Sequence, residues 1–368
     1  MNFQLLDKHK KKIIILDDLT SRWIKYCIPE NINFEELKTR RSIPIIFSIK
    51  FLLNLIYYSI KTKKFYLSFF ISVILEKKTE IVITFTDNNN LISNLGEEIK
   101  DILCISIQNG TRYKSIKTKS FTDIKKFHSY YSWGCFEKKL IENNGGNIER
   151  NYIVGSLKYG IYKKFFKNKL KNKRFITFIS QWRPGKNSVH NFLYHPYEKK
   201  NLINIYKYCE INSLNFKICP NFNYKTNEFK EEFKYYSQLI PNIHDHLFIK
   251  NDDIDTYMIS EYSEIIINHH SSVGFEFMGI DKKILFLGNR KSNLNYEPGW
   301  EENLMLLPNQ LKIFNDSETE LLNKLDALYK MNIKDYLTLI KESKKQYMIY
   351  QKEFAHEIIK KNIKDYLV

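Results

Sequence analysis

Short aliphatic runs alternate along the chain with longer stretches of helical period. In the first half these runs are rich in Ile and Val and end at polar residues, as in EIVITFT and ILCISI. Two helical patterns lie between residues 43 and 78. The predicted strands of this half are 12–17, 80–86, 102–107, 130–133 and 152–154. Strands that alternate with helices are typical of a parallel sheet, so we predict one Rossmann-like domain here.

A basic, polar stretch at residues 164–174 interrupts this alternation and is the predicted linker. The pattern then resumes, with strands predicted at 175–180, 216–219, 247–249, 264–268 and 283–287. Residues 316–368 have a helical period and many lysines. We therefore predict an α/β protein with an N-terminal Rossmann-like domain at 1–165, a second at 166–330, and C-terminal helices at 331–368 that pack across both.

The composition is that of a folded protein. Of 368 residues 43% are hydrophobic and only 12 are Gly and 8 Pro, which excludes disordered and collagen-like classes. The five cysteines form no CxxC pair, which argues against a disulfide framework and a structural zinc site and favours a reducing compartment. Residues 1–12 lack the apolar core of a signal peptide. We therefore expect a cytoplasmic protein.

The net charge of +17 predicts attraction to polyanions, which include nucleic acid, anionic lipid and phosphorylated substrates. The basic residues are dispersed and no nucleic-acid-binding motif is evident, so we do not expect a nucleic acid partner. The most apolar stretch, 44–60, contains Lys50 and Asn54 and is too short to span a bilayer. Residues 42–78, which are aromatic and basic, either dock on an anionic membrane or pack in the core.

Polar strand ends are the places where chemistry is expected, because ligands of open α/β sheets bind beyond the carboxyl ends of the strands, next to helix N-termini. The segment 268–276 (NHHSSVGFE) follows an apolar strand and precedes a helical pattern. Ser271 and Ser272 can cap that helix, and they can also donate hydrogen bonds to a phosphate. The two interpretations are compatible.

In the first domain Asp87 and Asn88 end one strand, and Gln108, Asn109 and Arg112 follow the next. Asp87 can act as a base or a nucleophile, or it can form an Asx turn or a helix N-cap. The amides and the guanidinium can hold an acceptor or a phosphate, or they can belong to a glycine turn.

His195 precedes Pro196, and we expect it in the loop after the first strand of the second domain. Histidine can donate a proton to a phosphate leaving group near neutral pH, but a residue before proline is more often part of a turn. Arg183 and Lys186 follow the same strand, where they can neutralise a phosphate or form a solvated turn.

No DxD-like motif suits a metal-bound sugar nucleotide. The acidic run Asp252, Asp253 and Asp255 has instead the pattern of a helix N-terminus, where acidic residues favour the helix dipole. We therefore expect chemistry without a metal and without another cofactor.

Several segments, in this order, resemble the bacterial surface carbohydrate biosynthesis protein family: IVITFTDNN, ISIQNGTR, WGCFEKKL, YIVGSLKYG, FISQW and HHSSVGFEF. The likeness runs from about residue 80 to about residue 289. His195 with Pro196 and Ser271 with Ser272 also resemble the HP and paired-serine motifs of GT-B sialyltransferases, polysialyltransferases and Kdo transferases, which use CMP-activated sugars.

This resemblance implies the GT-B fold, in which two Rossmann-like domains face a central cleft. It also implies a glycosyltransferase that moves a Kdo or sialic-acid-like sugar from a CMP-sugar to a glycan or lipid-linked acceptor. The product would belong to lipopolysaccharide, O-antigen or capsule, and the enzyme would be peripheral at the inner face of the cytoplasmic membrane.

The resemblance further implies residue roles. His195 would assist the departure of CMP or contact its phosphate, and Asp87 would act in the other domain, as the base of an inverting enzyme or the nucleophile of a retaining one. The acceptor or phosphate contacts would be Asn88, Gln108, Asn109, Arg112 and Arg183. The nucleotide-binding residues would be Ser271, Ser272 and His270, which contact phosphate, and Glu261 and Glu276, either of which could bind the ribose.

The alternative is a CDP-glycerol glycerophosphotransferase of teichoic acid synthesis, a family with similar HP and paired-serine motifs. That family carries a histidine at the strand end where this chain has Asn109. Asparagine cannot serve as a general base, so this departure favours the glycosyltransferase interpretation and shifts attention to Asp87.

Overall fold

The computed structural model describes residues 2–5, 11–16, 20–39, 42–45, 48–87, 90–111, 126–166, 175–184, 189–269, 271–288, 304, 306–314 and 317–367. The chain forms two compact units. Unit 1 comprises Met1–Ile161 and Ile349–Val368, and unit 2 comprises Tyr162–Met348. The chain passes from unit 1 to unit 2 within helix α6 and returns between the last two helices.

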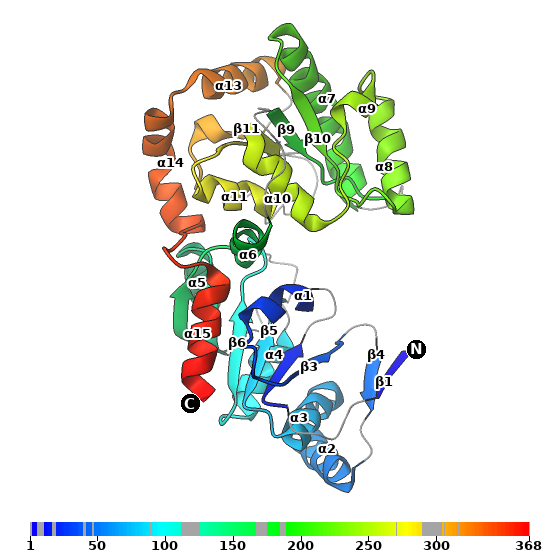
Figure 1. Ribbon diagram of the computed structural model, residues 1–368, viewed down its shortest axis with the longest axis vertical. Coiled ribbons are helices and arrows are strands. Elements are labelled where there is room, and N and C mark those ends of the chain that lie inside the picture. Colours follow the sequence, from blue (N-terminus) through cyan, green and yellow to red (C-terminus); the bar gives the residue numbers. More distant parts are fainter. Residues whose placement is uncertain are drawn as a thin grey trace. The chain divides into compact units, whose positions relative to one another are not determined.

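Unit 1 contains a six-stranded sheet in the order β3-β2-β5-β6-β7-β8, and all of its strand pairs are parallel (Figure 1). Its strands are β2 Ile13–Leu16, β3 Phe34–Leu37, β5 Ile81–Thr84, β6 Leu103–Ile107, β7 Lys126–Ser132 and β8 Asn147–Ile153. Every residue of β2 and β5 is buried, as expected for central strands that are covered on both faces. The continuous aliphatic runs that predicted these strands therefore reflect two-sided burial.

The helices of unit 1 are α1 Ser21–Ile24, η1 Lys25–Cys27, α2 Ile49–Thr62, α3 Phe65–Lys77, α4 Asn90–Glu98, α5 Phe136–Asn143, α6 Leu157–Phe165 and the C-terminal α15 Ala355–Leu367. Helices α2 and α3 form an antiparallel pair (Figure 1). A short parallel pair joins β1 Asn2–Leu5 to β4 Ser42–Ile45. Helix α15 packs against η1, and the amide of Asn362 donates to the hydroxyl of Tyr131, 3.0 Å away.

Unit 2 contains a five-stranded parallel sheet in the order β10-β9-β11-β12-β13. The strands are β9 Phe175–Ile179, β10 Phe216–Cys219, β11 Ser263–Asn268, β12 Lys283–Leu287 and β13 Lys312–Ile313. The helices are α7 Val189–Ile211, α8 Asn227–Ser237, α9 Ile243–His246, α10 Asp253–Tyr262, α11 Ser272–Gly279, η2 Asn309–Leu311, α13 Glu318–Lys330 and α14 Ile333–Tyr347. Helix α13 packs on α7, and α14 packs on α11.

The predicted α/β class with two parallel sheets is confirmed. Two local predictions are wrong. Residues 247–249 form no strand, because only Leu247 bridges to Ile218 before the chain turns towards the cap of α10. Residues 43–45, taken as the start of a helical pattern, belong to β4, and α2 begins only after its N-cap Ser48.

Of the predicted linker 164–174, the first residues end α6, and 167–174 lie outside the described residues. Across the described part of the chain, no helix has both the length and the hydropathy that a membrane-spanning segment requires.

Candidate functional site

Both sheets place their first strand between the second and the third. In unit 1 β2 lies between β3 and β5, and in unit 2 β9 lies between β10 and β11. The chain runs from the first strand to the second on one side of it and then crosses to the third strand on the other side. This reversal of the strand order creates a topological switch point beyond the carboxyl ends of the first and third strands. Ligands of open α/β sheets bind at such points. Asp87 follows β5 and Ser271 follows β11, so both sequence-predicted segments lie at switch points.

Asp87 is buried just beyond β5, and its carboxylate is held from two directions. The backbone N–H of Asn109 donates to Oδ1 at 3.3 Å, and the hydroxyl of Tyr130 donates to Oδ2 at 3.0 Å. These donors come from the ends of β6 and β7, so three neighbouring strands orient one carboxylate. A carboxylate fixed in this way is suited to accept a proton or to attack an electrophilic carbon.

Thr84 holds together the two strand ends that define the switch point of unit 1. Its hydroxyl donates to the carbonyl of Leu16 at the end of β2, 2.9 Å away, and accepts from the N–H of Thr86 at 3.0 Å. The turn that presents Asp87 is therefore fastened to the neighbouring strand as well as to its own.

The other candidates of unit 1 differ in their surroundings. Gln108 is completely buried, and its amide bonds to backbone groups, with Oε1 accepting from Trp133 N at 2.6 Å and Nε2 donating to Gly110 O at 3.1 Å. Gln108 thus shapes the loop that carries Asn109. Asn88 and Arg112 lie outside the described residues.

Ser271 and Ser272 occupy the strand–turn–helix that their sequence predicted. Ser271 is the N-cap of α11, and its hydroxyl accepts from Val273 N at 3.4 Å. Its own N–H donates to Oδ1 of Asn268, the last residue of β11, at 3.1 Å. Ser272 is the first residue of the helix and is only half-buried. Two hydroxyls thus lie where the free N–H groups and the dipole of a helix favour an anion.

Unit 2 also contains a cluster of buried polar side chains around the ends of β9 and β11, which no sequence pattern had indicated. It consists of Ser180 after β9, Glu198 in α7, Glu232 and Tyr236 in α8, and His269 after β11. Tyr236 Oη lies 2.7 Å from Ser180 Oγ and 2.9 Å from Glu198 Oε1. Ser180 Oγ lies 2.5 Å from Glu232 Oε1. The cluster therefore connects two carboxyl groups through two hydroxyls.

The donors around Glu232 identify it as the ionised member. The backbone N–H groups of Asn221 and Phe222 donate to its two oxygens at 2.9 and 3.0 Å, and Ser180 donates to Oε1. Since the one hydrogen of Ser180 goes to Glu232, the hydroxyl of Tyr236 donates to Ser180 Oγ. Tyr236 Oη is also placed to donate to Glu198 Oε1, 2.9 Å away, so its one hydrogen is shared between Ser180 and Glu198.

Burial favours the neutral form of the Glu198 carboxyl. Complete burial raises the pKa of Glu198 to about 7, a shift that the Tyr236 hydrogen bond opposes and the charge of Glu232 reinforces. Burial also raises the pKa of Glu232, but its three hydrogen bonds and nearby Lys250 oppose that shift. Two carboxyl groups held in such different surroundings take different protonation states.

His269 links the cluster to the paired-serine turn. Its Nδ1 lies 3.0 Å from the carbonyl of Leu287 and must carry the hydrogen, because a carbonyl only accepts. Its Nε2 faces Oε2 of Glu198 at 3.6 Å. His269 thus contacts the buried cluster two residues before the N-cap Ser271.

The two glutamates assigned to the ribose differ in accessibility. Glu276 is buried in α11, and its Oε2 accepts from the hydroxyl of Tyr257 at 2.9 Å. Glu261 at the end of α10 keeps part of its surface exposed, accepts from Tyr162 Oη at 2.7 Å and pairs with Lys163. Glu261 is therefore the more accessible of the two.

His195 was expected in a loop, and that prediction is wrong. Residues 195 and 196 lie inside α7, because the helix continues through the proline that had suggested a turn. The side chain of His195, like all of Lys186 and His270, lies outside the described residues. Arg183 is described and exposed, in the segment after β9.

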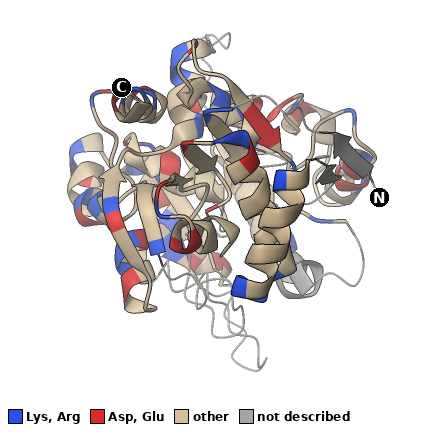
Figure 2. Ribbon diagram, turned by 90° about the horizontal axis from the view of Figure 1, so that it is seen from below, with Lys and Arg blue, Asp and Glu red and all other residues tan. Residues whose placement is uncertain are grey.

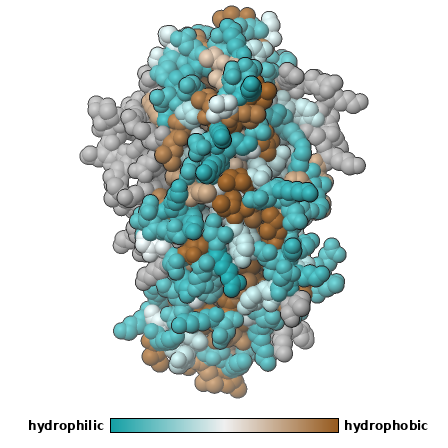
Figure 3. All heavy atoms as spheres, turned by 90° about the vertical axis from the view of Figure 1, so that its left-hand side faces the viewer, coloured by the Kyte–Doolittle hydropathy of each residue, from teal (hydrophilic) through white to brown (hydrophobic). Residues whose placement is uncertain are grey.

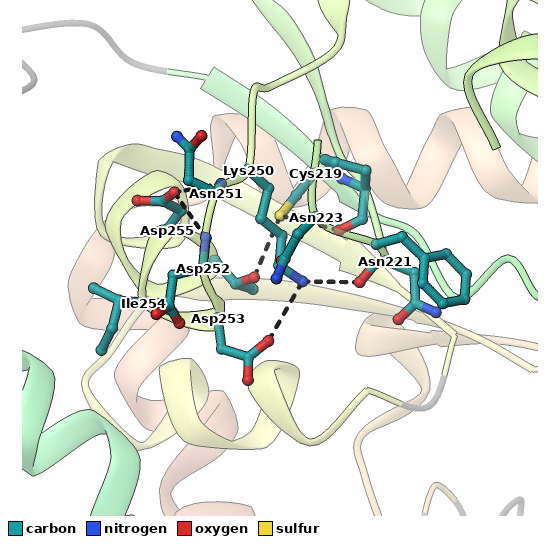
Figure 4. Close-up of polar contacts among 12 residues, drawn as sticks. Cys219, Asn221, Asn223, Lys250, Asn251, Asp252, Asp253, Ile254 and Asp255 are labelled. Carbon is teal, nitrogen blue, oxygen red and sulfur yellow. Dashed lines mark hydrogen bonds and ion pairs between the residues drawn. The ribbon is translucent and has the colours of Figure 1, made fainter. Parts of the chain in front are cut away.

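The acidic run before α10 is a helix cap, as its sequence indicated. Asp252 accepts from Ile254 N at 3.3 Å, and Asp255 accepts from the N–H groups of Asn251 and Asp252. Figure 4 shows the same loop around buried Lys250, whose ammonium donates to Asn221 O at 2.9 Å and lies 3.8 Å from Asp253. Within the described ranges, no group of three or more His, Cys, Asp or Glu side chains is placed to hold a metal ion.

No protein family model matches the sequence, and no curated protein matches it. Solved structures do match. A complex of S. aureus MnaA with UDP is similar with a TM-score of 0.59 and 13% identity, over 97% of each chain. The UDP-GlcNAc 2-epimerase of Methanocaldococcus jannaschii has a TM-score of 0.54 at 13% identity, over 97% of this chain and 99% of that chain.

A variant of the wall teichoic acid polymerase TagF has a TM-score of 0.55 at 13% identity, over 98% of this chain and 92% of that chain. At such identities the similarity establishes the fold. The chain has the GT-B fold, with two Rossmann-like units and a helical C-terminal region.

Proposed function

We propose that the protein is a glycosyltransferase that transfers a Kdo or sialic-acid-like sugar from a CMP-activated donor to a lipid-linked or oligosaccharide acceptor of a surface polysaccharide. The single observation that carries the proposal is the position of Ser271 and Ser272. They lie at the N-terminus of α11, beyond β11, at the switch point of unit 2. Helix N-termini at switch points are the usual phosphate sites of this kind of fold.

In the proposed reaction the bond between the anomeric carbon and the phosphate oxygen breaks, and CMP leaves with its negative charge. The hydroxyls of Ser271 and Ser272 and the first N–H groups of α11 stabilise that charge. By the sequence resemblance, His195 assists the departure. In an inverting reaction Asp87 removes the proton of the acceptor hydroxyl while the acceptor oxygen bonds to the anomeric carbon. In a retaining reaction Asp87 first bonds to that carbon, and the acceptor oxygen then displaces the carboxylate and releases its proton to water. The anomeric configuration of the product distinguishes the two.

The surroundings of Asn109 favour sugar transfer over glycerophosphotransfer. At the position where a histidine base would be expected, Asn109 supplies a backbone N–H to Asp87. The carboxylate of Asp87, which follows the neighbouring strand β5, takes the role of the base in this proposal. We also propose that no metal is needed, because Asp252 and Asp255 serve as a helix cap. A lipid-linked acceptor would place the enzyme at the inner face of the cytoplasmic membrane.

The experiment is a calorimetric titration with CMP, CDP, UDP and GDP, each with and without EDTA. CMP-selective binding that EDTA leaves unchanged is expected. CDP selectivity would instead indicate glycerophosphotransfer, and UDP selectivity would overturn the CMP-sugar donor.

Variants sharpen this titration. Ser271→Ala with Ser272→Ala should weaken CMP binding by about 30-fold, because roughly 1 kcal/mol is lost with each phosphate hydrogen bond. Ser317→Ala is the matched control, since Ser317 is also an N-cap, of α13, and accepts from Glu320 N at 3.2 Å. It should lower stability by about 1 kcal/mol and leave CMP affinity unchanged. If the double serine variant and Ser317→Ala bind CMP with equal affinity, the phosphate does not bind at the N-terminus of α11.

A further inference from the structure

Helix α2 carries an apolar face that points away from the protein. Ile49 is 80% exposed, Leu53 63% and Ile60 74%, although each is a large aliphatic side chain. The remaining exposed members of this face are Leu52, Ile56 and Tyr57, and Phe65 and Tyr66 follow at the start of α3. We call these eight residues the α2 face. Single exposed apolar side chains are ordinary, but a contiguous set of this size marks an interaction surface.

The helical period shows that this exposure is not a by-product of packing. Phe51, Leu55 and Tyr58 lie on the opposite side of α2 and pack against the hydrophobic core of unit 1. Leu52 and Ile56, one turn apart, lie on the outward side. Helix α2 is thus apolar on two opposite sides, and the core uses only one of them. A helix that is apolar on both sides is normally covered on both.

The charged residues of the segment that carries the α2 face are of one sign. Residues 38–75 contain no Asp or Glu, whereas they include Lys38, Arg40, Arg41, Lys50, Lys61, Lys63 and Lys64. Lys50 is exposed near the start of α2, and Lys63 and Lys64 are exposed in the turn before α3. Lys61 pairs with Glu98, at 2.9 Å. Basic residues that border an apolar helix face favour an anionic lipid surface.

Figure 2 shows the charged residues of this region, and Figure 3 shows its hydrophobic surface. In Figure 2, which views this side of the structure, the ribbons of α2 and α3 are almost entirely tan, with blue near the helix ends. In Figure 3, hydrophobic side chains gather at the lower edge, where α2 lies in Figure 1.

We propose that the α2 face binds the surface of an anionic lipid bilayer. Helix α2 lies in the plane of the interface, with its aliphatic side chains among the acyl chains and Lys50, Lys63 and Lys64 at the lipid phosphates. Bilayer binding would bring the enzyme to a lipid-linked acceptor, so the biological role of this surface rests on the proposed function. The surface itself is defined without reference to the nucleotide site.

The test is sedimentation of the full chain with vesicles made of equal parts of phosphatidylcholine and phosphatidylglycerol. Replacing Leu52, Leu53 and Ile56 together by Gln should weaken binding by about 100-fold or more, because each buried aliphatic side chain contributes strongly to interfacial affinity. The control variant replaces Ile211 and Ile333, exposed aliphatic residues of unit 2, by Gln. It should bind the vesicles as tightly as the wild type does. Gln favours helices about as well as Leu, so both variants should fold.

The lysines test the electrostatic part. Replacing Lys50, Lys63 and Lys64 by Gln should weaken binding to these vesicles by about fivefold per lysine and change little with phosphatidylcholine alone. Equal binding of wild type and the aliphatic variant would overturn the proposal. The proposal would also be overturned if the wild type did not bind vesicles but formed a concentration-dependent dimer that the aliphatic variant abolishes. The α2 face would then contact a second copy of the chain. Unchanged CMP affinity in the aliphatic variant would separate this surface from the nucleotide site.

Discussion

At the switch point of unit 1 a single buried carboxylate, Asp87, accepts hydrogen bonds from a backbone N–H and a tyrosine hydroxyl. At the switch point of unit 2 two buried carboxyl groups, Glu198 and Glu232, are joined through Tyr236 and a serine. The strand order around the two points is the same, but the number of buried carboxyl groups and their hydrogen-bond partners differ. In unit 1 hydrogen-bond donors surround the one carboxylate, whereas in unit 2 burial raises the pKa of Glu198 to about 7 and so favours its neutral form.

The largest effect is expected from Asp87→Asn. Removing a general base or nucleophile should lower the rate of CMP release from CMP-Kdo or CMP-sialic acid by about a thousandfold. Folding should be affected much less, because Asn keeps the shape but exchanges one acceptor for a donor, at a cost of about 1–2 kcal/mol. Tyr130→Phe is the control, since it removes one hydrogen bond and keeps the carboxylate. If both variants lose the same activity, Asp87 only supports the loop.

The next effect concerns pH. The pKa of Glu198 is about 7 in the folded protein, above its ordinary value of 4.5, so the folded state holds the extra proton between these values. The free energy of unfolding should therefore fall as pH rises from about 4.5 to about 7, by up to about 3 kcal/mol. Glu198→Gln, which resembles the neutral acid, should abolish this fall and be more stable than wild type at pH 8.

Thermal midpoints of wild type and Glu198→Gln at pH 5 and pH 8 measure this contribution. Glu231→Gln is the control, because Glu231 lies on the exposed side of the same helix as Glu232. Its midpoints should follow those of the wild type. Parallel curves for Glu198→Gln and wild type would mean that Glu198 titrates normally, and the contrast between the two units would then be lost.

The candidate site residues also differ in how far the sequence predicts their positions. Asp87 and Ser271 directly follow aliphatic strands, so the position of each beyond a sheet edge follows from its place in the chain. Glu198 and Tyr236 belong to helices, and only the packing of α7 and α8 brings them to the end of β9. No spacing along the chain signals that arrangement. His195 was misplaced for a related reason, because Pro196 suggested a turn where the helix continues.

The α2 face shows a similar limit. The apolar and basic composition of residues 42–78 is evident from the sequence, but a core helix and a docking helix have the same composition. Helix α3 is largely buried, with Phe70, Ile71 and Ile74 in the core, whereas its partner α2 exposes most of its aliphatic residues. Which of these side chains are exposed therefore depends on tertiary packing and not on composition.

The smallest effect is expected at a glycine next to the proposed phosphate site. A Cβ at Gly274 in α11 would lie 2.5 Å from Asn268 Nδ2 and 2.8 Å from Phe286 Cε1, and both of these side chains are completely buried. Overpacking of this kind costs about 1–3 kcal/mol, which exceeds the helix propensity gained with Ala. Gly274→Ala should therefore lower stability by about 1 kcal/mol.

The same substitution should weaken CMP binding, because a displaced Asn268 loses the hydrogen bond that its Oδ1 accepts from Ser271 N. Gly96→Ala in unit 1 is the matched helical control. Its Cβ would lie 3.0 Å from His128 Nε2, a milder contact that the propensity gain should roughly offset. Gly96→Ala should leave CMP affinity unchanged. Equal losses of CMP affinity in the two variants would show that affinity follows overall stability, and the phosphate would then have no particular dependence on the turn before α11.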